Sequence, residues 1–258
     1  MEISTLIVFG STSSIAKAIL TELDVKPSRI FSFDRVSPNQ EINEYIPESN
    51  QSRVDWDNIN EIESFVISRL TQNISDPVLI LNFMGYFGNI ESVDDLDIDD
   101  ALLTNSKNLT SFLLIAKIAR FLPTDSRIIS FSGAGVGGDN LDDSSLGYLA
   151  AKASMAVLTE TIDQQLQKHG VRFGLISPGA FPSRMQEVVS KESSDKIPEK
   201  RVLRAREVMT STPSTKKLVD LIEFLAENPQ QLGGRTWSAN FDNLTDQIGN
   251  FGKLRRIY

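Results

Sequence analysis

Hydrophobic and polar positions alternate along the chain in two recurring patterns. Short apolar runs rich in β-branched residues predict strands, and longer segments with apolar residues three or four positions apart predict helices. The predicted strands span residues 3–10, 29–34, 78–82, 127–132, 171–177 and 235–239, with a short strand near 53–55. The predicted helices span residues 14–23, 58–72, 98–121, 147–168 and 214–227.

The order of these elements predicts the fold class. Strands and helices alternate along the chain, and the strands are almost continuously apolar. This combination is typical of a parallel sheet covered by helices on both faces. We therefore expect an α/β fold with a doubly wound parallel sheet of about seven strands in three α/β/α layers. Residues 1–258 contain no internal repeat and no low-complexity segment, so one domain is expected. Sheets of this kind bind ligands at the carboxyl ends of their strands.

One segment interrupts the alternation. Residues 184–212 lie between a predicted strand and a predicted helix and are mostly polar. A connection of this length is either disordered or functional, and its place beside the carboxyl edge of the sheet favours a substrate lid. It carries Arg184, Arg201, Arg204 and Arg206, whose guanidinium groups are suited to phosphate binding. The alternative explanation for these arginines is the solvated face of a lid helix.

Composition excludes several classes of protein. The chain has 258 residues, of which 40% are hydrophobic, enough for one sizeable core. It has no cysteine and one histidine, His169, which excludes thiolate metal sites and zinc sites built mainly from imidazoles. The formal charge of -8, without a long basic run, argues against nucleic acid as a partner. We find neither a signal peptide nor an apolar run that could cross a membrane, and expect a soluble cytoplasmic protein.

The stretch V-F-G-S-T-S-S-I-A-K-A at residues 8–18 joins the first predicted strand to the first predicted helix. Gly10 allows a tight turn, and the free amides at the start of the helix can face a pyrophosphate. Dinucleotide-binding turns usually carry three glycines, whereas this one has Ser14 and Ala16 at the second and third positions. The simpler alternative is a strand–helix turn with a serine N-cap.

Asp34 favours the cofactor interpretation of that turn. It ends the second predicted strand, at the distance expected for the acidic residue that binds the adenosine ribose. A carboxylate there accepts hydrogen bonds from both ribose hydroxyls and repels a 2′-phosphate, which predicts NAD rather than NADP. Arg35 follows directly and works against this preference, since it would attract the phosphate. The alternative for Asp34 is an exposed loop residue.

Two further patterns are rejected as sites. G-A-G-V-G-G at residues 133–138 fits the dinucleotide fingerprint literally, but D-N-L-D-D-S-S follows instead of a helix start. We expect a flexible loop beside the active site. D-L-D-I-D-D at residues 95–100 suggests a calcium loop, yet it lacks the required glycine and glutamate. Acidic residues that favour the dipole of the following helix explain it.

Tyr148 and Lys152 are the candidate catalytic pair. Four residues apart on a predicted helix, they share a face. A lysine ammonium near a phenol stabilises the phenolate and lowers the pKa of the tyrosine, so that it can exchange a proton with a substrate hydroxyl. Such spacing also arises by chance on solvent-exposed faces. Ser132, at the carboxyl end of a predicted strand, points to the same region and strengthens the signal.

Together, these motifs resemble the short-chain dehydrogenase/reductase family over nearly the whole chain. The resemblance implies a Rossmann-type fold and reversible hydride transfer between NAD and a secondary alcohol or ketone. It implies that Tyr148 is the general acid/base and that Ser132 orients the substrate oxygen. It also implies that Lys152 lowers the tyrosine pKa and holds the nicotinamide ribose, and that Asn105 anchors a water that relays protons.

The resemblance also implies a set of cofactor-binding residues. It includes an adenine-binding aspartate in R-V-D-W, an N-F-M-G stretch in place of the family's N-N-A-G, and a proline–glycine turn that meets the nicotinamide. The implied set is Gly10, Ser11, Ser13, Ser14, Ile15, Asp34, Arg35, Asp55, Trp56, Asn82, Met84, Gly85, Tyr148, Lys152, Pro178, Gly179, Phe181 and Ser183. No metal is implied.

Three departures from the family pattern affect cofactor affinity more than chemistry. They are Ser14, the altered N-F-M-G, and a longer gap between Ser132 and Tyr148. The chain end, G-G-R-T-W-S-A-N-F-D followed by L-R-R-I-Y, loosely resembles family members from surface-polysaccharide and sugar-nucleotide pathways. This resemblance implies a substrate that is a sugar or nucleotide sugar.

Other functions remain as alternatives. One is an NAD-binding regulatory protein without turnover, and another is an NAD-dependent sugar epimerase or dehydratase, although those relatives have a larger C-terminal domain. The absence of a G-x-S-x-G elbow and the single, poorly placed histidine argue against a serine hydrolase. The family commonly forms dimers and tetramers through its long helices, so a homodimer or homotetramer is expected, with a small-molecule substrate and neither nucleic acid nor membrane as partner.

Overall fold

The computed structural model describes residues 3–24, 27–35, 44–55, 58–71, 74–133, 145–192, 196–211, 215–240 and 242. Seven strands form one sheet in the order β3-β2-β1-β4-β5-β6-β7, and all neighbouring strands are parallel. The strands are β1 (Thr5–Phe9), β2 (Arg29–Asp34), β3 (Gln51–Arg53), β4 (Val78–Asn82), β5 (Arg127–Phe131), β6 (Arg172–Ser177) and β7 (Thr236–Ser238). The predicted α/β class with a seven-stranded parallel sheet is confirmed.

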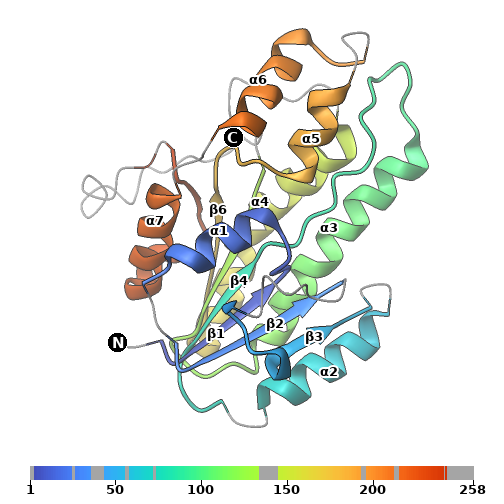
Figure 1. The fold of residues 1–258 in the computed structure, drawn as a ribbon. Coiled ribbons are helices and arrows are strands. Elements are labelled where there is room, and N and C mark those ends of the chain that lie inside the picture. Colours follow the sequence, from blue (N-terminus) through green and yellow to red (C-terminus); the bar gives the residue numbers. More distant parts are fainter. Residues whose placement is uncertain are drawn as a thin grey trace.

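Helices cover both faces of the sheet and make three layers (Figure 1). One face packs against α2 (Ile59–Thr71), α3 (Ile98–Ala119) and α4 (Leu146–Leu166). The other packs against α1 (Ser14–Glu22), α7 (Lys216–Glu227) and the short α8 (Pro229–Leu232). Two separate apolar clusters, one on each face, therefore hold the layers together. The three-layer arrangement confirms the prediction.

The central strands are apolar because they are enclosed on all sides. Every residue of β1, β4 and β5 is buried, as expected for strands with a parallel neighbour on each edge and helices on each face. The strand order reverses beside β1, since β2 lies on one side of it and β4 on the other. The loops that follow β1 and β4 thus leave the sheet in different directions and open a crevice, the usual ligand site of such sheets.

Two helices lie together beyond one end of the sheet (Figure 1). They are α5 (Arg184–Lys191) and α6 (Glu199–Thr210), which occupy most of the segment predicted as a lid. They share a third, small apolar cluster formed by Ile90, Val189, Ile197, Val202 and Ala205. The partly buried ring of Phe87 packs against this cluster. The segment after β4, which supplies Phe87 and Ile90, therefore packs against the two helices through this cluster.

The predicted boundaries differ from the observed ones by at most two residues at either end, in central β1 as well as at the sheet edges. β3 covers Gln51–Arg53, two residues earlier than predicted, and β7 covers only Thr236–Ser238. Edge strands are covered on fewer sides, so their sequences carry a weaker apolar pattern. Among the described residues, no helix has the length and apolar character needed to cross a membrane.

Candidate active site

The turn after β1 requires a glycine. Gly10 has a φ of +79°, and a Cβ at this position would lie 3.1 Å from the backbone nitrogen of Met84. Any side chain would therefore be strained by its backbone and would press on the turn after β4. The backbone N–H of Gly10 donates to the carbonyl of Phe33 in β2 at 3.1 Å. Gly10 thus brings the ends of β1, β2 and β4 together at the crevice.

Helix α1 starts directly behind this turn. Ser13 is its N-cap, and the Ser13 hydroxyl accepts from the N–H of Ala16 at 3.2 Å. Ile15 packs against the apolar cluster of this face. Ser14 is the first helical residue, and its exposed hydroxyl donates to the carbonyl of Pro182 at 2.6 Å. The predicted N-cap serine is therefore present, and the Ser14 hydroxyl is held by the loop after β6.

Asp34 is buried, and its carboxylate accepts hydrogen bonds from residues of the turn after β1. Its Oδ2 accepts from the Ser11 hydroxyl at 2.7 Å, and its Oδ1 accepts from the N–H of Thr12 at 3.2 Å. Asp34 and Ser11 have no exposed surface. The alternative of an exposed loop aspartate is wrong, because the side chain fixes the conformation of the turn. Arg35 directly after it is exposed.

The other residues expected near the adenosine are only partly described. Asp55 is exposed and lies two residues beyond β3. The N–H of Asn58 donates to its carbonyl at 3.1 Å. Trp56 lies outside the described residues.

The N-F-M-G stretch forms a pinned turn at the end of β4. The buried side chain of Asn82 donates through Nδ2 to the Ser130 hydroxyl at 3.2 Å and accepts through Oδ1 from the N–H of Met84 at 3.2 Å. Phe83 stacks on Phe131 with ring centroids 4.3 Å apart. Gly85 is exposed at the crevice. The substitutions relative to N-N-A-G thus add an aromatic pair and keep the asparagine that shapes the turn.

Two asparagines lie close together on α3, at positions 105 and 108. Asn105 is partly buried, and its Oδ1 has no hydrogen-bond partner among the described residues. Asn108 is buried, donates through Nδ2 to the carbonyls of Tyr86 and Thr104 at 2.6 and 2.8 Å, and accepts from the N–H of Tyr86 at 3.2 Å. Asn108 therefore fixes the backbone that leads out of the N-F-M-G turn. No motif of the predicted site singled out Asn108 in advance.

Lys152 is buried on α4 beside Tyr148. Its Nζ donates to the Phe131 carbonyl at 3.1 Å and lies 5.4 Å from the centroid of the Tyr148 ring. Removal from water lowers the pKa of Lys152 to about 8. Phe87 packs against the Tyr148 ring in a T-shaped arrangement, at 5.4 Å between centroids. The predicted pair is therefore brought together at the carboxyl end of β5.

The Tyr148 hydroxyl lies against Gly133 rather than against Ser132. A Cβ at position 133 would lie 2.6 Å from the Tyr148 oxygen. Ser132 follows β5 as expected, but its side chain is buried, and its Oγ has no hydrogen-bond partner among the described residues. The structure thus places Ser132 next to the pair without joining its hydroxyl to the phenol. Position 133 is the one that faces the tyrosine oxygen.

The loop after β6 forms the opposite side of the site. Gly179 has a φ of +87°, and a Cβ there would lie 2.6 Å from Nδ2 of Asn240, so Pro178-Gly179 is a tight turn that requires glycine. Phe181 is buried in the apolar cluster that includes α1. Ser183 caps α5, and its hydroxyl accepts from the N–H of Gln186 at 3.3 Å. These contacts hold the backbone of Pro182 beside Ser14.

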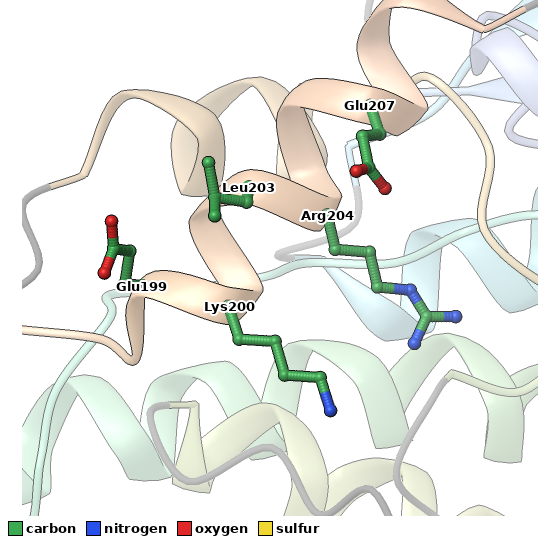
Figure 2. Close-up of a pocket in the computed structure, with 5 residues that line it drawn as sticks. All are labelled: Glu199, Lys200, Leu203, Arg204 and Glu207. Atoms are coloured by element: carbon green, nitrogen blue, oxygen red, sulfur yellow. The ribbon is translucent and has the colours of Figure 1, made fainter.

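The four lid arginines have different surroundings. Arg206 donates through Nε to the Ser190 carbonyl at 3.0 Å and links α6 to α5. Arg201 is half-buried, whereas Arg184 is exposed. Arg204 is exposed and borders a hollow of about 520 Å³. That hollow is lined by Glu199, Lys200, Leu203, Arg204 and Glu207, and Figure 2 shows the ends of Lys200 and Arg204 extending from the same side of α6.

The structure describes one of the two rejected motifs, residues 95–100, in full and only the first residue of the other. Asp97 is the N-cap of α3, and its carboxylate accepts from the N–H groups of Asp99 and Asp100 at 2.9 and 3.2 Å, which confirms the helix-dipole explanation. Of the G-A-G-V-G-G stretch, only Gly133 belongs to the described residues. Within those residues, no group of three or more acidic or histidine side chains is placed to hold a metal ion.

These residues fit a nicotinamide dinucleotide. The glycine turn, the free amides of α1 and the pinned turn after β4 surround the crevice between β1 and β4, where such a cofactor binds in doubly wound sheets. The Tyr148–Lys152 pair lies further along the same edge, below the loop after β6. Several members of the set, among them Ser14 and Asp34, hold side-chain hydrogen bonds within the protein.

Comparisons with known proteins agree with this geometry. A family model described as enoyl-(acyl carrier protein) reductase matches residues 10–230. A search of curated protein sequences finds no match. Among solved structures, a short-chain dehydrogenase/reductase from Saccharomyces cerevisiae is 14% identical, with a TM-score of 0.76 over 94% of this chain and 98% of that one.

Two other solved structures have the same fold. Sorbitol-6-phosphate 2-dehydrogenase from Erwinia amylovora is 14% identical, with a TM-score of 0.71 over 90% of this chain and 96% of that one. An oxidoreductase of the short-chain dehydrogenase/reductase family from Brucella ovis, in complex with a partially ordered NAD, is 16% identical, with a TM-score of 0.65 over 92% of this chain and 99% of that one. Because the family model spans most of the sequence and the site has the matching architecture, the chain belongs to the short-chain dehydrogenase/reductase family of oxidoreductases.

Proposed function

We propose that the protein reversibly transfers a hydride between NAD(H) and a secondary alcohol or ketone. The observation that supports this most directly is the buried Lys152 amine beside Tyr148, whose hydroxyl lies at the carboxyl edge of the sheet against Gly133. A titratable phenol next to a buried cation is the minimum needed to exchange a proton with a substrate oxygen.

In this mechanism, the protein handles the proton. Lys152, with a pKa lowered to about 8 by burial, still carries its proton at neutral pH and stabilises a phenolate beside it. Tyr148 takes the proton from the substrate alcohol during oxidation and returns it during reduction. When bound, NAD supplies the hydride acceptor and NADH the donor. The carbonyl of Phe131 holds the Lys152 amine in place through the 3.1 Å hydrogen bond.

We propose NAD as the preferred cofactor, on the basis of Asp34. Its charge lies buried beneath the turn where the adenosine ribose is expected, and a 2′-phosphate would be repelled there. In this structure both carboxylate oxygens accept hydrogen bonds from the turn, through the Ser11 hydroxyl and the N–H of Thr12, so the proposed preference rests on the charge of Asp34 and not on free lone pairs. Direct measurement of both dissociation constants tests this, and tighter binding of NADP would overturn it.

The Tyr148→Phe variant tests the catalytic proposal. Loss of the phenol oxygen should lower kcat by about 100-fold or more, while NAD binding stays within about twofold. Tyr86→Phe is the matched control, since Tyr86 carries a cation–π contact with Lys107 and no proposed role in proton transfer. Turnover is followed by nicotinamide absorbance with a panel of nucleotide sugars and simple alcohols. Full activity in Tyr148→Phe would remove the proposal.

A second candidate is an NAD-binding regulatory protein without turnover. The observation in its favour is Ser132, whose buried Oγ is not bonded to the phenol. The same panel distinguishes the two functions. A protein that binds NAD but reduces or oxidises no member of the panel would support the regulatory function.

We propose a phosphate-bearing substrate such as a nucleotide sugar. The support is the lid hollow, where Lys200 and Arg204 extend to the same side of α6 and residues 184–212 act as the lid. Replacing both by alanine should raise KM for a nucleotide sugar about tenfold and leave KM for an uncharged alcohol unchanged. The exposed Lys216 on α7 provides a control substitution. An equal effect on both substrates would contradict the phosphate-binding role.

A further inference from the structure

A hydrogen bond from Ser14 to Pro182 joins two sides of the site. The Ser14 hydroxyl donates to the Pro182 carbonyl at 2.6 Å, although the residues are far apart in sequence. Ser14 belongs to the start of α1, and Pro182 belongs to the loop between β6 and α5. One exposed hydroxyl therefore joins the phosphate side of the site to the nicotinamide side.

Each partner is held in place by its own surroundings. On the α1 side, Ser13 caps the helix and fixes Ser14 as the first helical residue. On the loop side, buried Phe181 anchors the chain before Pro182, and Ser183 caps α5 after it. The bond therefore connects two supported backbones, and its loss would free the Pro182 carbonyl and the Ser14 hydroxyl while buried Phe181 keeps the loop packed on the cluster that includes α1.

The bond is made by the first residue of α1, at the helix N-terminus where a pyrophosphate is expected to bind. A pyrophosphate that binds at the start of a helix needs the free N–H groups and close access to the first turn. In dinucleotide-binding turns a glycine commonly provides that access. In this chain the position carries the Ser14 side chain, which occupies the space and is tied to the facing loop. Cofactor and the Ser14–Pro182 bond therefore compete for the same place.

We propose that the Ser14–Pro182 hydrogen bond is a latch that closes the cofactor site of the free protein and must open for NAD to bind. Ser14 is then a positioning residue that sets the rate and affinity of cofactor binding. This inference rests on the proposed NAD binding. A net contribution typical of one neutral hydrogen bond corresponds to about a fivefold change in a binding constant.

Ser14→Ala tests the latch because it removes the hydroxyl and keeps the helix. NADH binding, measured by stopped-flow fluorescence, should show an association rate and an affinity about fivefold higher than in the unaltered protein. Ser14→Gly, which also removes the Cβ, should bind at least as tightly. Thr21→Ala is the matched control, because the Thr21 hydroxyl on the same helix donates only within the helix, to the Lys17 carbonyl at 2.8 Å. Its binding should not change.

Hydrogen exchange in the free protein provides a readout that is independent of the cofactor. Ser14→Ala should accelerate exchange at the amides of residues 179–181 and 183, whereas Thr21→Ala should not. If NADH binds and Ser14→Ala binds it no faster, or more weakly, the latch is overturned and the proposed function stands. If neither protein binds NAD or NADP, the proposed function itself fails.

Discussion

At the scale of single residues, the buried amine of Lys152 has the clearest energetic consequence. Burial lowers its pKa from 10.5 to about 8, because the charged form loses its hydration. The folded state therefore releases this proton near pH 8, whereas the unfolded chain keeps it up to about pH 10.5. Between these values only the unfolded state carries the extra proton, so this residue makes folding more favourable as pH rises.

This linkage predicts a pH-dependent stability difference. The methionine of Lys152→Met carries no charge, so its burial has no charge penalty at any pH. The unaltered protein becomes more stable between pH 8 and 10.5 as its penalty disappears. The free energy of unfolding of the variant minus that of the unaltered protein should therefore fall over this range. The expected total is roughly 3 kcal/mol, from the width of that window. Urea denaturation at several pH values measures it, with Lys216→Met, an exposed lysine, as control. A difference that stays constant with pH would contradict the assigned burial cost.

The buried hydroxyl of Ser132 gives a second prediction at the scale of single residues. The Ser132 hydroxyl is buried without a hydrogen-bond partner among the described residues, and an unsatisfied buried hydroxyl is destabilising. Ser132→Ala should therefore leave stability unchanged or raise it by about 1 kcal/mol, and kcat/KM should stay within about threefold. Thermal unfolding and steady-state kinetics check this. A 100-fold loss of kcat/KM would restore Ser132 as the residue that orients the substrate.

Some of these residue-scale features were predictable, and others depend on tertiary contacts. The Tyr148–Lys152 pair follows from helical spacing alone. Asn105 and Asn108 lie less than one helical turn apart, so spacing does not decide between them, and only the Asn108 contacts with Tyr86 distinguish it. The position of Asp34 at the end of β2 was predicted correctly, but its burial depends on the Ser11 hydroxyl across the turn.

At the scale of elements, the lid depends on few apolar side chains. Between residues 184 and 212 the apolar residues are few and occur singly or in pairs, and Val189 and Val202 are among those buried in the small cluster. Their partners Phe87 and Ile90 come from the segment after β4. The sequence therefore predicted a lid but did not predict its two helices, because the cluster that stabilises them is assembled from separate parts of the chain.

Phe87 connects the small cluster around Val189 and Val202 to the candidate catalytic residue Tyr148. Its ring packs on the cluster and edge-on against Tyr148, so Phe87→Ala should loosen both contacts. We expect amide exchange in α5 and α6 to accelerate by about tenfold, with exchange in β1 and β4 unchanged. We also expect kcat to fall, because the phenol loses a supporting ring. Phe121→Ala, which removes an exposed ring at the end of α3, is the control. If amide exchange in α5 and α6 is unchanged in Phe87→Ala, the proposed role of Phe87 in stabilising these helices is wrong.

At the scale of the whole molecule, the parallel sheet was predictable because its central strands are almost continuously apolar. Enclosure on every side requires this pattern, and it marks β1, β4 and β5 clearly in the sequence. The order of the strands follows less directly. The return of the chain from β3 to β4, across β2 and β1, is a long-range packing outcome that no local pattern encodes. That return creates the crevice beside Gly10.

The outer surface of α3 and α4 predicts self-association. Leu102 and Leu113 are 62% and 45% exposed on α3 and lie about three turns apart on one side of the helix. Val157 on the adjoining α4 is 48% exposed. The two helices pack against each other, so their exposed apolar residues form a surface that a second copy of this chain can cover. We therefore propose a homodimer or homotetramer formed through these helices.

This assembly is tested with Leu102→Asp/Leu113→Asp. Charges on both positions should shift the protein to monomers in sedimentation equilibrium while circular dichroism stays unchanged, because both side chains lie outside the core. Val93→Asp, at a residue that is 73% exposed in the loop before α3, should keep the oligomer. A monomeric unaltered protein would contradict the proposed assembly. An oligomer that survives the double substitution would show that its interface lies elsewhere. Since Tyr148 and Lys152 lie on α4, loss of the interface should also lower kcat if packing between copies supports that helix.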